Sequence, residues 1–215
     1  MGGGTSSYRE MEEAEVVVLW GSNARETHPI YFHHVLKAVN RGAKLFVVDP
    51  RRTSSADWAD TWLGLNVGTD IVLANAVARE ILAAGLHHRE FCENATSSFE
   101  EFCAHVEPYT LERAEQECGV PAESIRRLAH VYATADRGQI CWTLGITEHH
   151  NAVDNVLSLI NLSLLTGHVG RFAAGLSPLR GQNNVQGGGD MGAIPNRLVG
   201  FQDFEQPAIR AWFEK

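Results

Sequence analysis

The strongest constraint on the fold is a strand–helix–strand pattern within the first fifty residues. Residues Ala14–Trp20 form a continuous apolar run that ends at Gly21, which is typical of a buried parallel strand. Pro29 begins an apolar helical pattern that ends near Gly42, and Lys44–Val48 reads as a second strand. Parallel strands joined by a helix require a sheet whose faces are covered by helices. The pattern therefore predicts an α/β fold.

The same alternation continues along the chain. A third strand, a long helix, a fourth strand and another long helix follow at Thr61–Leu65, Ile71–Ala84, Gln139–Leu144 and Ala152–Leu165. Between residues 86 and 135, apolar side chains recur at helical spacing and are interrupted by Pro and Gly, which predicts several short helices. We expect a three-layer α/β/α sandwich with a mainly parallel, Rossmann-like sheet and a helical insertion.

Length and composition bound the domain organisation. The chain has 215 residues, of which 44% are hydrophobic, so a sizeable core can form. We predict an α/β domain over residues 1–178, with its helical patch at about 86–135. After Gly175 the chain is expected to be irregular. Residues 179–215 are predicted to hold an irregular loop and the start of a truncated neighbouring domain, because no convincing long periodicity follows residue 195.

Charge and cysteine usage exclude several classes of protein. A net charge of −8 argues against a nucleic-acid binder, since phosphate contacts need clusters of Lys and Arg. No apolar run reaches the ~18 residues of a membrane span. The four cysteines form no C-x-x-C pair, so no metal or iron–sulfur ligands are predicted in this chain. Unpaired cysteines are typical of a reducing compartment, so we expect a cytoplasmic protein.

Three polar loops follow strands and are expected to meet at one edge of the sheet. They are Gly21–His28, Asp49–Thr53 and Gly145–Asn151. Open parallel sheets bind ligands at this carboxyl edge. The first loop lacks a G-x-G-x-x-G sequence, so an ordinary NAD dehydrogenase is not expected.

Acidic residues in or beside these loops are candidates for ligand binding. Asp49 is placed to accept hydrogen bonds from ribose hydroxyls or a base edge, or it forms the turn before a proline. The segment Gly68–Asp70 supplies the cap of the next helix, and the free N–H groups at that helix end can also bind an anion. Glu148 and His149 are either functional or simply exposed loop residues.

The stretch Pro178–Gly192 combines glycines with side-chain amides, Arg180 and Asp190. Five glycines among residues 181–192 let the backbone approach a ligand closely. This composition suits a polar ligand held at several points, and it also suits a mobile surface loop.

Four loop sequences occur in a characteristic order: Trp20–Asn23 with Thr27–Pro29, Val48–Thr53, Gly68–Asp70 and Arg180–Gly187. In this order and spacing they resemble the molybdopterin oxidoreductase family. The resemblance is strongest to the catalytic alpha subunits of molybdenum- or tungsten-dependent formate dehydrogenases and their relatives. The segments Leu144–Glu148 and Leu165–Gly170 fit the same family, and the likeness spans about residues 1–203.

This resemblance implies a bis-molybdopterin guanine dinucleotide cofactor that carries Mo or W. It implies that residues 1–178 are the domain that binds this cofactor and that the irregular loop in residues 179–215 is an active-site loop. In the family, the first loops hold the guanosine and diphosphate end of one pterin dinucleotide, and the loop at residues 145–148 approaches the same cofactor. The arginine that heads the Arg-Gly-Gln-Asn-Asn motif lies beside the metal and is implicated in orienting formate. By position, the resemblance implies Arg180 as the catalytic residue and, as cofactor-binding residues, Gly21, Asn23, Asp49, Arg51, Gly68, Asp70, Gly145, Glu148 and Gln182.

The chain also departs from the family pattern. Nothing in it resembles the family's four-cysteine [4Fe–4S] segment or its Cys or selenocysteine metal ligand, and the C-terminal cofactor-capping domain has no counterpart. We therefore expect an internal piece of a longer enzyme, inactive alone, whose missing domains and electron-acceptor subunit are its partners. The parent is expected to oxidise formate to CO2 and pass electrons through iron–sulfur carriers. Two alternatives stay open: another enzyme of this family, such as a nitrate reductase-like protein, and a non-catalytic scaffold like the large subunit of respiratory complex I.

Overall fold

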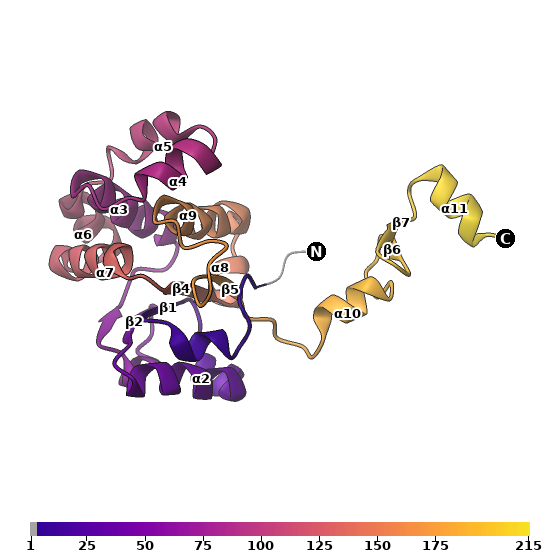
Figure 1. Cartoon of the computed structure of the whole chain (residues 1–215), viewed down its shortest axis with the longest axis horizontal. Helices are drawn as coiled ribbons and strands as arrows, with labels where there is room; N and C mark the ends of the chain where they lie inside the picture. The colour runs from indigo at the N-terminus through magenta and orange to yellow at the C-terminus, as the bar shows by residue number, and fades with distance from the viewer. Residues whose placement is uncertain (1–3) are drawn as a thin grey trace. The chain divides into compact units, whose positions relative to one another are not determined.

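The computed structural model describes residues 4–215, so the first three residues of the predicted α/β domain lie outside the described residues. Contacts divide the described chain into two compact units, Gly4–Leu179 and Arg180–Lys215. The first unit contains the large sheet and most of the helices (Figure 1). Between residues 4 and 215, no helix has both the length and the apolar character needed to cross a membrane.

A five-stranded parallel sheet forms the centre of the first unit, in the order β3-β2-β1-β4-β5. The chain winds outward from β1 through β2 to β3 and then crosses back, so that β4 pairs with the other side of β1. The strand order therefore reverses between β1 and β4, and open α/β sheets bind ligands at such a point. The strands are β1 (Val16–Trp20), β2 (Lys44–Val48), β3 (Thr61–Leu63), β4 (Gly138–Trp142) and β5 (Gly175–Pro178).

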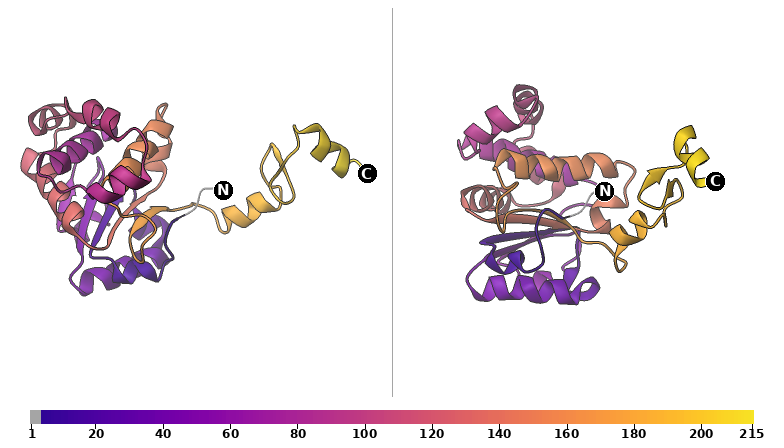
Figure 2. Two further views of the ribbon diagram at one scale, coloured as in Figure 1. Left: turned by 45° about the horizontal axis from the view of Figure 1, so that its top comes forward. Right: turned by 45° about the vertical axis from the view of Figure 1, so that its right-hand side comes forward.

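Helices cover both faces of the sheet (Figure 2). One face carries α2 (Pro29–Asn40), and the other carries α3 (Asp70–Ala83), α7 (Ala122–Thr134) and α9 (Ala152–Leu165). The predicted α/β sandwich with a parallel Rossmann-like sheet and a helical insertion is confirmed. The other helices of this unit are η1 (Glu10–Glu13), α1 (Ala24–Thr27), η2 (Ala56–Trp58), α4 (Arg89–Ala95), α5 (Phe99–Val106), α6 (Leu111–Cys118) and α8 (Leu144–Thr147).

Residues of β1 alternate between two apolar cores. Val18 and Trp20 pack on the side of α3, α7 and α9, whereas Val17 and Leu19 pack on the side of α2. All five residues of the strand are buried. Because helices cover both faces, no side of the strand meets water, and the sequence is therefore continuously apolar rather than alternating.

Two short elements of the first unit differ from the prediction. The sequence predicts irregular chain after Gly175, but Gly175–Pro178 forms β5. Gly and Pro are poor strand formers, and the pairing of this segment with β4 decides its conformation. The loop predicted after β4 contains one helical turn, α8, because Ile146 is buried and Asn155 donates from Nδ2 to the Ile146 carbonyl at 3.1 Å.

The second unit is a short run of small elements. It contains α10 (Val185–Asp190), the antiparallel pair β6 (Arg197–Leu198) and β7 (Gln202–Asp203), and α11 (Pro207–Phe213). The prediction of a loop throughout residues 178–192 is wrong for α10. This helix forms because Asn184 caps it, its side-chain oxygen accepting a hydrogen bond from the backbone N–H of Gly187 at 3.2 Å.

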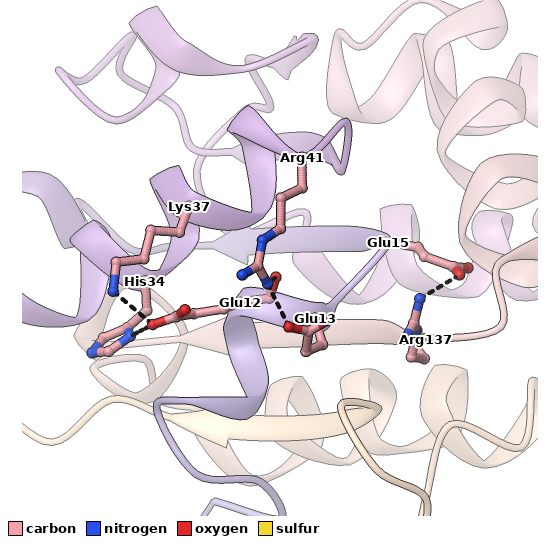
Figure 3. Close-up of polar contacts among 7 residues, drawn as sticks. All are labelled: Glu12, Glu13, Glu15, His34, Lys37, Arg41 and Arg137. Carbon is pink, nitrogen blue, oxygen red and sulfur yellow. Dashed lines mark hydrogen bonds and ion pairs between the residues drawn. The ribbon is translucent and has the colours of Figure 1, made fainter.

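Ion pairs connect the segments at the edge of the sheet where the strands begin (Figure 3). They join the segment before β1 to α2 and to the start of β4. Surface pairs of this kind contribute only about 0–1 kcal/mol each. The basic side chains of these pairs lie at the edge of the sheet opposite to the loops that follow the strands. The pairs are His34–Glu12 (2.7 Å), Lys37–Glu12 (2.8 Å), Arg41–Glu13 and Arg137–Glu15 (3.0 Å).

A buried histidine after α9 makes the fold sensitive to acid. His168 is fully buried, and its Nε2 donates to the Tyr132 carbonyl at 2.9 Å. Its Nδ1 accepts from Arg171 at 3.1 Å, and since a guanidinium only donates, the ring is neutral. Burial lowers the pKa of His168 below its ordinary value. The unfolded chain therefore binds this proton more readily, so stability is fully present above the unfolded pKa of about 6.5 and is lost as the pH falls toward the folded pKa.

Replacing His168 with Asn is expected to lower the free energy of unfolding by about 1–3 kcal/mol at neutral pH, because buried hydrogen-bonding groups lose their partners. The difference in free energy of unfolding between the two proteins should shrink as the pH falls below about 6.5. In that range only the wild-type protein is destabilised by protonation of His168 in its unfolded chain. Urea unfolding across that range measures both effects. The exposed His150→Asn change serves as the control, and a deficit independent of pH would contradict the assignment.

Candidate functional site

The loops after β1 and β4 touch at the point where the strand order reverses. The Gly21 carbonyl accepts hydrogen bonds from the Thr143 hydroxyl at 2.7 Å and from the Gly145 N–H at 3.2 Å. Gly21 has a φ of 57°, in the left-handed region, and a Cβ on it would lie 2.8 Å from the Gly145 carbonyl carbon. Because both residues at this contact are glycines, the two backbones can approach closely. The contact therefore brings the predicted site residues Gly21 and Gly145 together.

The loop after β2 joins the same edge through Asn23, the N-cap residue of α1. The Asn23 Oδ1 accepts a hydrogen bond from the Ser55 hydroxyl at 3.2 Å. The Ser55 hydroxyl in turn accepts from the Arg25 N–H at 3.0 Å. These contacts hold the two loops against each other, since Ser55 lies just beyond the predicted Asp49–Thr53 segment.

Asp49 closes a turn at the end of β2. Its Oδ1 accepts from the backbone N–H of Arg51 at 2.9 Å, and its side chain is almost fully buried. The turn-forming role that the sequence left open is therefore present. The Arg51 side chain is exposed at the same edge, so a cation is available there for an anionic ligand.

Asp70 is the first residue of α3 and is only 7% exposed. The indole Nε1 of Trp20, at the end of β1, donates to its Oδ1 at 2.8 Å. Burial raises the pKa of the Asp70 carboxyl, the Trp20 hydrogen bond and the neighbouring His149 oppose the rise, and the Asp49 carboxylate adds to it. The carboxylates of Asp49 and Asp70 and the loop after β4 are thus close enough for electrostatic interaction.

The remaining predicted residues are placed as follows. Gly68 precedes α3 with a φ of 86°. Thr69, considered as a helix cap, instead donates from its hydroxyl to the Asn66 carbonyl at 2.7 Å and makes no cap hydrogen bond. Glu148 is exposed at the end of α8. Arg180 and Gln182 are exposed at the start of the second unit.

Sequence reasoning missed three residues at this edge. Ser22 and Thr53 are buried, and within residues 4–215 neither hydroxyl has a hydrogen-bond partner. Trp62 on β3 is exposed at the carboxyl edge, and its Nε1 donates to the Asp49 carbonyl at 2.9 Å. Both hydroxyls stand within the polar loops and could have been suspected on that ground, whereas the sequence carries no signal for the tryptophan.

Comparison with known proteins matches these loops and this sheet to one family. The profile of the molybdopterin oxidoreductase family matches residues 3–213. F420-dependent formate dehydrogenase 2 subunit alpha of Methanococcus maripaludis is 41% identical over 198 residues, which cover 92% of this chain and 29% of that protein. Formate dehydrogenase H of Escherichia coli is 40% identical over 211 residues, covering 98% of this chain and 30% of that protein.

A solved structure shows the same relationship. Acetylene hydratase from Pelobacter acetylenicus superposes with a TM-score of 0.71 at 30% identity, covering 76% of this chain and 22% of that one. The chain thus spans about 30% of the length of the curated relatives described here. Sequence profile, relatives and fold agree that this chain belongs to the molybdopterin oxidoreductase family.

Proposed function

We propose that the first unit forms one part of a binding site for a molybdopterin guanine dinucleotide cofactor. We call this part the half-site, and it contacts the guanosine and diphosphate end of the cofactor. We also propose that the parent enzyme is a formate dehydrogenase. The observation that carries the half-site is the buried Asp70 carboxylate, held by Trp20 beside Asp49 where the strand order reverses. A carboxylate only accepts hydrogen bonds, and the Watson–Crick edge of guanine offers adjacent N–H donors, whereas adenine places an acceptor there. Asp70 therefore suits guanine.

The other residues of this edge fit the rest of a dinucleotide. Within residues 4–215 the buried Ser22 and Thr53 hydroxyls have no hydrogen-bond partner. Buried polar groups are normally hydrogen-bonded, so both hydroxyls are available to a bound polar ligand. A Cβ on Gly68 would meet nothing within 4 Å, so open space adjoins the N–H groups that begin α3. The Arg51 guanidinium can pair with a phosphate, and Asp49 can accept from ribose hydroxyls. Gly21, Asn23, Gly145 and Glu148 are assigned to the same cofactor. Gln182, in the second unit, is assigned to it only through the resemblance to the family's Arg-Gly-Gln-Asn-Asn motif.

Formate oxidation to CO2 releases one proton and two electrons, and the bound cofactor would supply the metal, Mo or W, that accepts the electron pair. Residues of this chain would bind and orient. We assign formate to Arg180, because a guanidinium is always charged and matches a carboxylate with two parallel N–H···O bonds. Formate as the substrate is supported by the formate dehydrogenase relatives at about 40% identity. Iron–sulfur carriers, an acceptor subunit and a cytoplasmic location complete the proposal.

The half-site is tested by calorimetric titration of the purified chain with GDP, with ADP as the control. We expect selective binding of GDP, weakened about tenfold in the Asp49→Ala protein, because the ribose hydroxyls lose a charged acceptor. Glu123→Ala, an exposed acidic change on α7, should leave the affinity unchanged. Equal binding of GDP and ADP would contradict guanine recognition, and absence of binding to either would sink the preformed half-site.

The role of Arg180 is tested in the full-length parent. An Arg180→Lys change keeps the charge but loses the fork, so we expect the KM for formate to rise about tenfold with an unchanged molybdenum or tungsten content. Formate-dependent reduction of a viologen dye gives the kinetics, and elemental analysis gives the metal content. A KM equal to that of the parent would remove Arg180 from formate binding.

One other function is favoured by a specific observation, and a second is disfavoured by another. A different reaction on the same scaffold is favoured by the similarity to acetylene hydratase, and a nitrate reductase-like activity belongs to the same class of alternatives. A non-catalytic scaffold, as in complex I, is disfavoured because a buried carboxylate costs stability without a ligand to justify it. Dye-linked turnover by the parent with formate, compared with nitrate, separates formate oxidation from a nitrate reductase-like activity, and turnover of neither substrate would contradict both.

A further inference from the structure

An exposed tryptophan is hydrogen-bonded beside the proposed nucleotide site. Trp62 lies on β3, the edge strand next to β2, and is 37% exposed. Its Nε1 donates to the Asp49 carbonyl at 2.9 Å, so the indole reaches from β3 to the turn that ends β2. The same aspartate carries the side chain that we assign to ribose.

A glycine lies directly against the ring of this indole. A Cβ on Gly64 would lie 2.7 to 3.2 Å from three atoms of the Trp62 ring system. Gly64 does not have a positive φ, so its backbone does not require glycine. The space it leaves is filled by the indole. An exposed ring that is oriented in advance loses little entropy on binding a ligand.

We propose that Trp62 is the stacking platform for the purine base of the nucleotide bound at this edge. This inference rests on the proposed half-site and assigns two different contacts with the base to two residues. The carboxylate of Asp70 selects the base through its edge, whereas the indole binds its face, and aromatic stacking accepts any base. Trp62 therefore supplies affinity for the nucleoside without supplying selectivity.

The purified chain and four variants test these two roles with GDP, ADP and pyrophosphate as probes. In the Trp62→Leu protein we expect GDP affinity to fall about tenfold, whereas pyrophosphate affinity stays unchanged. Trp62→Phe keeps a ring and should recover part of the loss. Gly64→Ala keeps the tryptophan but pushes its ring aside, so it should weaken GDP as Trp62→Leu does. GDP should also quench tryptophan emission more strongly in the wild-type chain and in Trp58→Leu, the exposed-tryptophan control, than in Trp62→Leu, where Trp20 still lies against Asp70.

The outcomes separate this inference from the proposal beneath it. If the wild-type chain binds GDP selectively and Trp62→Leu binds it equally well, the stacking role is overturned and the half-site survives. If Trp62→Leu weakens GDP and pyrophosphate alike and also lowers the Tm, the residue is only structural. If the wild-type chain binds no nucleotide, both proposals fail. Loss of GDP affinity with unchanged pyrophosphate affinity and unchanged Tm supports the stacking platform.

Discussion

Replacing Asp70 with Asn is expected to abolish the preference of this chain for GDP over ADP and to make the empty chain more stable. The amide retains one oxygen, so the Trp20 indole keeps its acceptor. It loses the second acceptor and the charge that match the donors of guanine. A hydrogen bond to a charged group contributes about 1.5–3 kcal/mol, so the affinity for GDP should fall about 10- to 100-fold. Calorimetric titration with both nucleotides measures the change.

The stabilising half of this prediction follows from burial. The folded pKa of Asp70 is raised above its ordinary value, chiefly by desolvation. The folded chain therefore holds this proton more tightly than the unfolded chain. The benefit is fully present below the unfolded pKa of about 3.9 and is lost as the pH rises through the folded pKa. At neutral pH the buried charge is a net cost, and Asp70→Asn removes it.

Unfolding of both proteins by urea, from neutral pH down toward about pH 4, tests the sign of the effect. The advantage of Asp70→Asn should be largest at neutral pH and should shrink in acid. Asp154→Asn on the exposed start of α9 is the matched control, because that carboxylate is exposed. A variant less stable than the wild-type chain at neutral pH would mean that the carboxylate is retained for the fold rather than for a ligand.

Local patterns predicted the elements whose formation depends on their own residues. The runs that became β1 and β2, and the helix Ala152–Leu165, were predicted within two residues of their bounds, because apolar periodicity and the glycines or prolines at their ends lie within the segments themselves. β5 was missed for the opposite reason. Its four residues include Gly175 and Pro178, and only pairing with β4, distant in sequence, makes them a strand.

The candidate site shows the same division. That the polar loops share an edge follows from parallel topology, and the contact of Gly21 with Gly145 agrees with that expectation. The partner of Asp70 could not be foreseen, because Trp20 lies fifty positions earlier and reads simply as an apolar strand residue. The orphaned hydroxyls and the orientation of Trp62 likewise depend on tertiary packing. The assignments of all ten site residues stay predictions until the titrations are made.

The contact between the loops after β1 and β4 leads to the largest expected loss of stability. In Gly21→Ala, the new methyl group must adopt a left-handed backbone conformation and would also lie 2.8 Å from the Gly145 carbonyl carbon. Strain and overpacking together are expected to lower the free energy of unfolding by about 3 kcal/mol. For a chain of this size, that corresponds to a Tm lower by roughly 6–12 °C. Thermal unfolding followed by circular dichroism measures it.

Two other glycines separate the two causes. Gly145→Ala brings a methyl group within 2.6 Å of the Gly21 carbonyl oxygen without a positive φ, so it tests the clash alone. Gly42→Ala has a φ of 102° with nothing within 4 Å of the new methyl group, so it tests backbone strain alone. We expect Gly21→Ala to lower the free energy of unfolding by about as much as the other two changes combined. Only the two changes at the loop contact should weaken GDP binding, because only they push apart the loops at the reversal of strand order. If Gly42→Ala destabilised the chain as much as Gly21→Ala does, the close approach of the loops would contribute nothing beyond the conformation of the glycine itself.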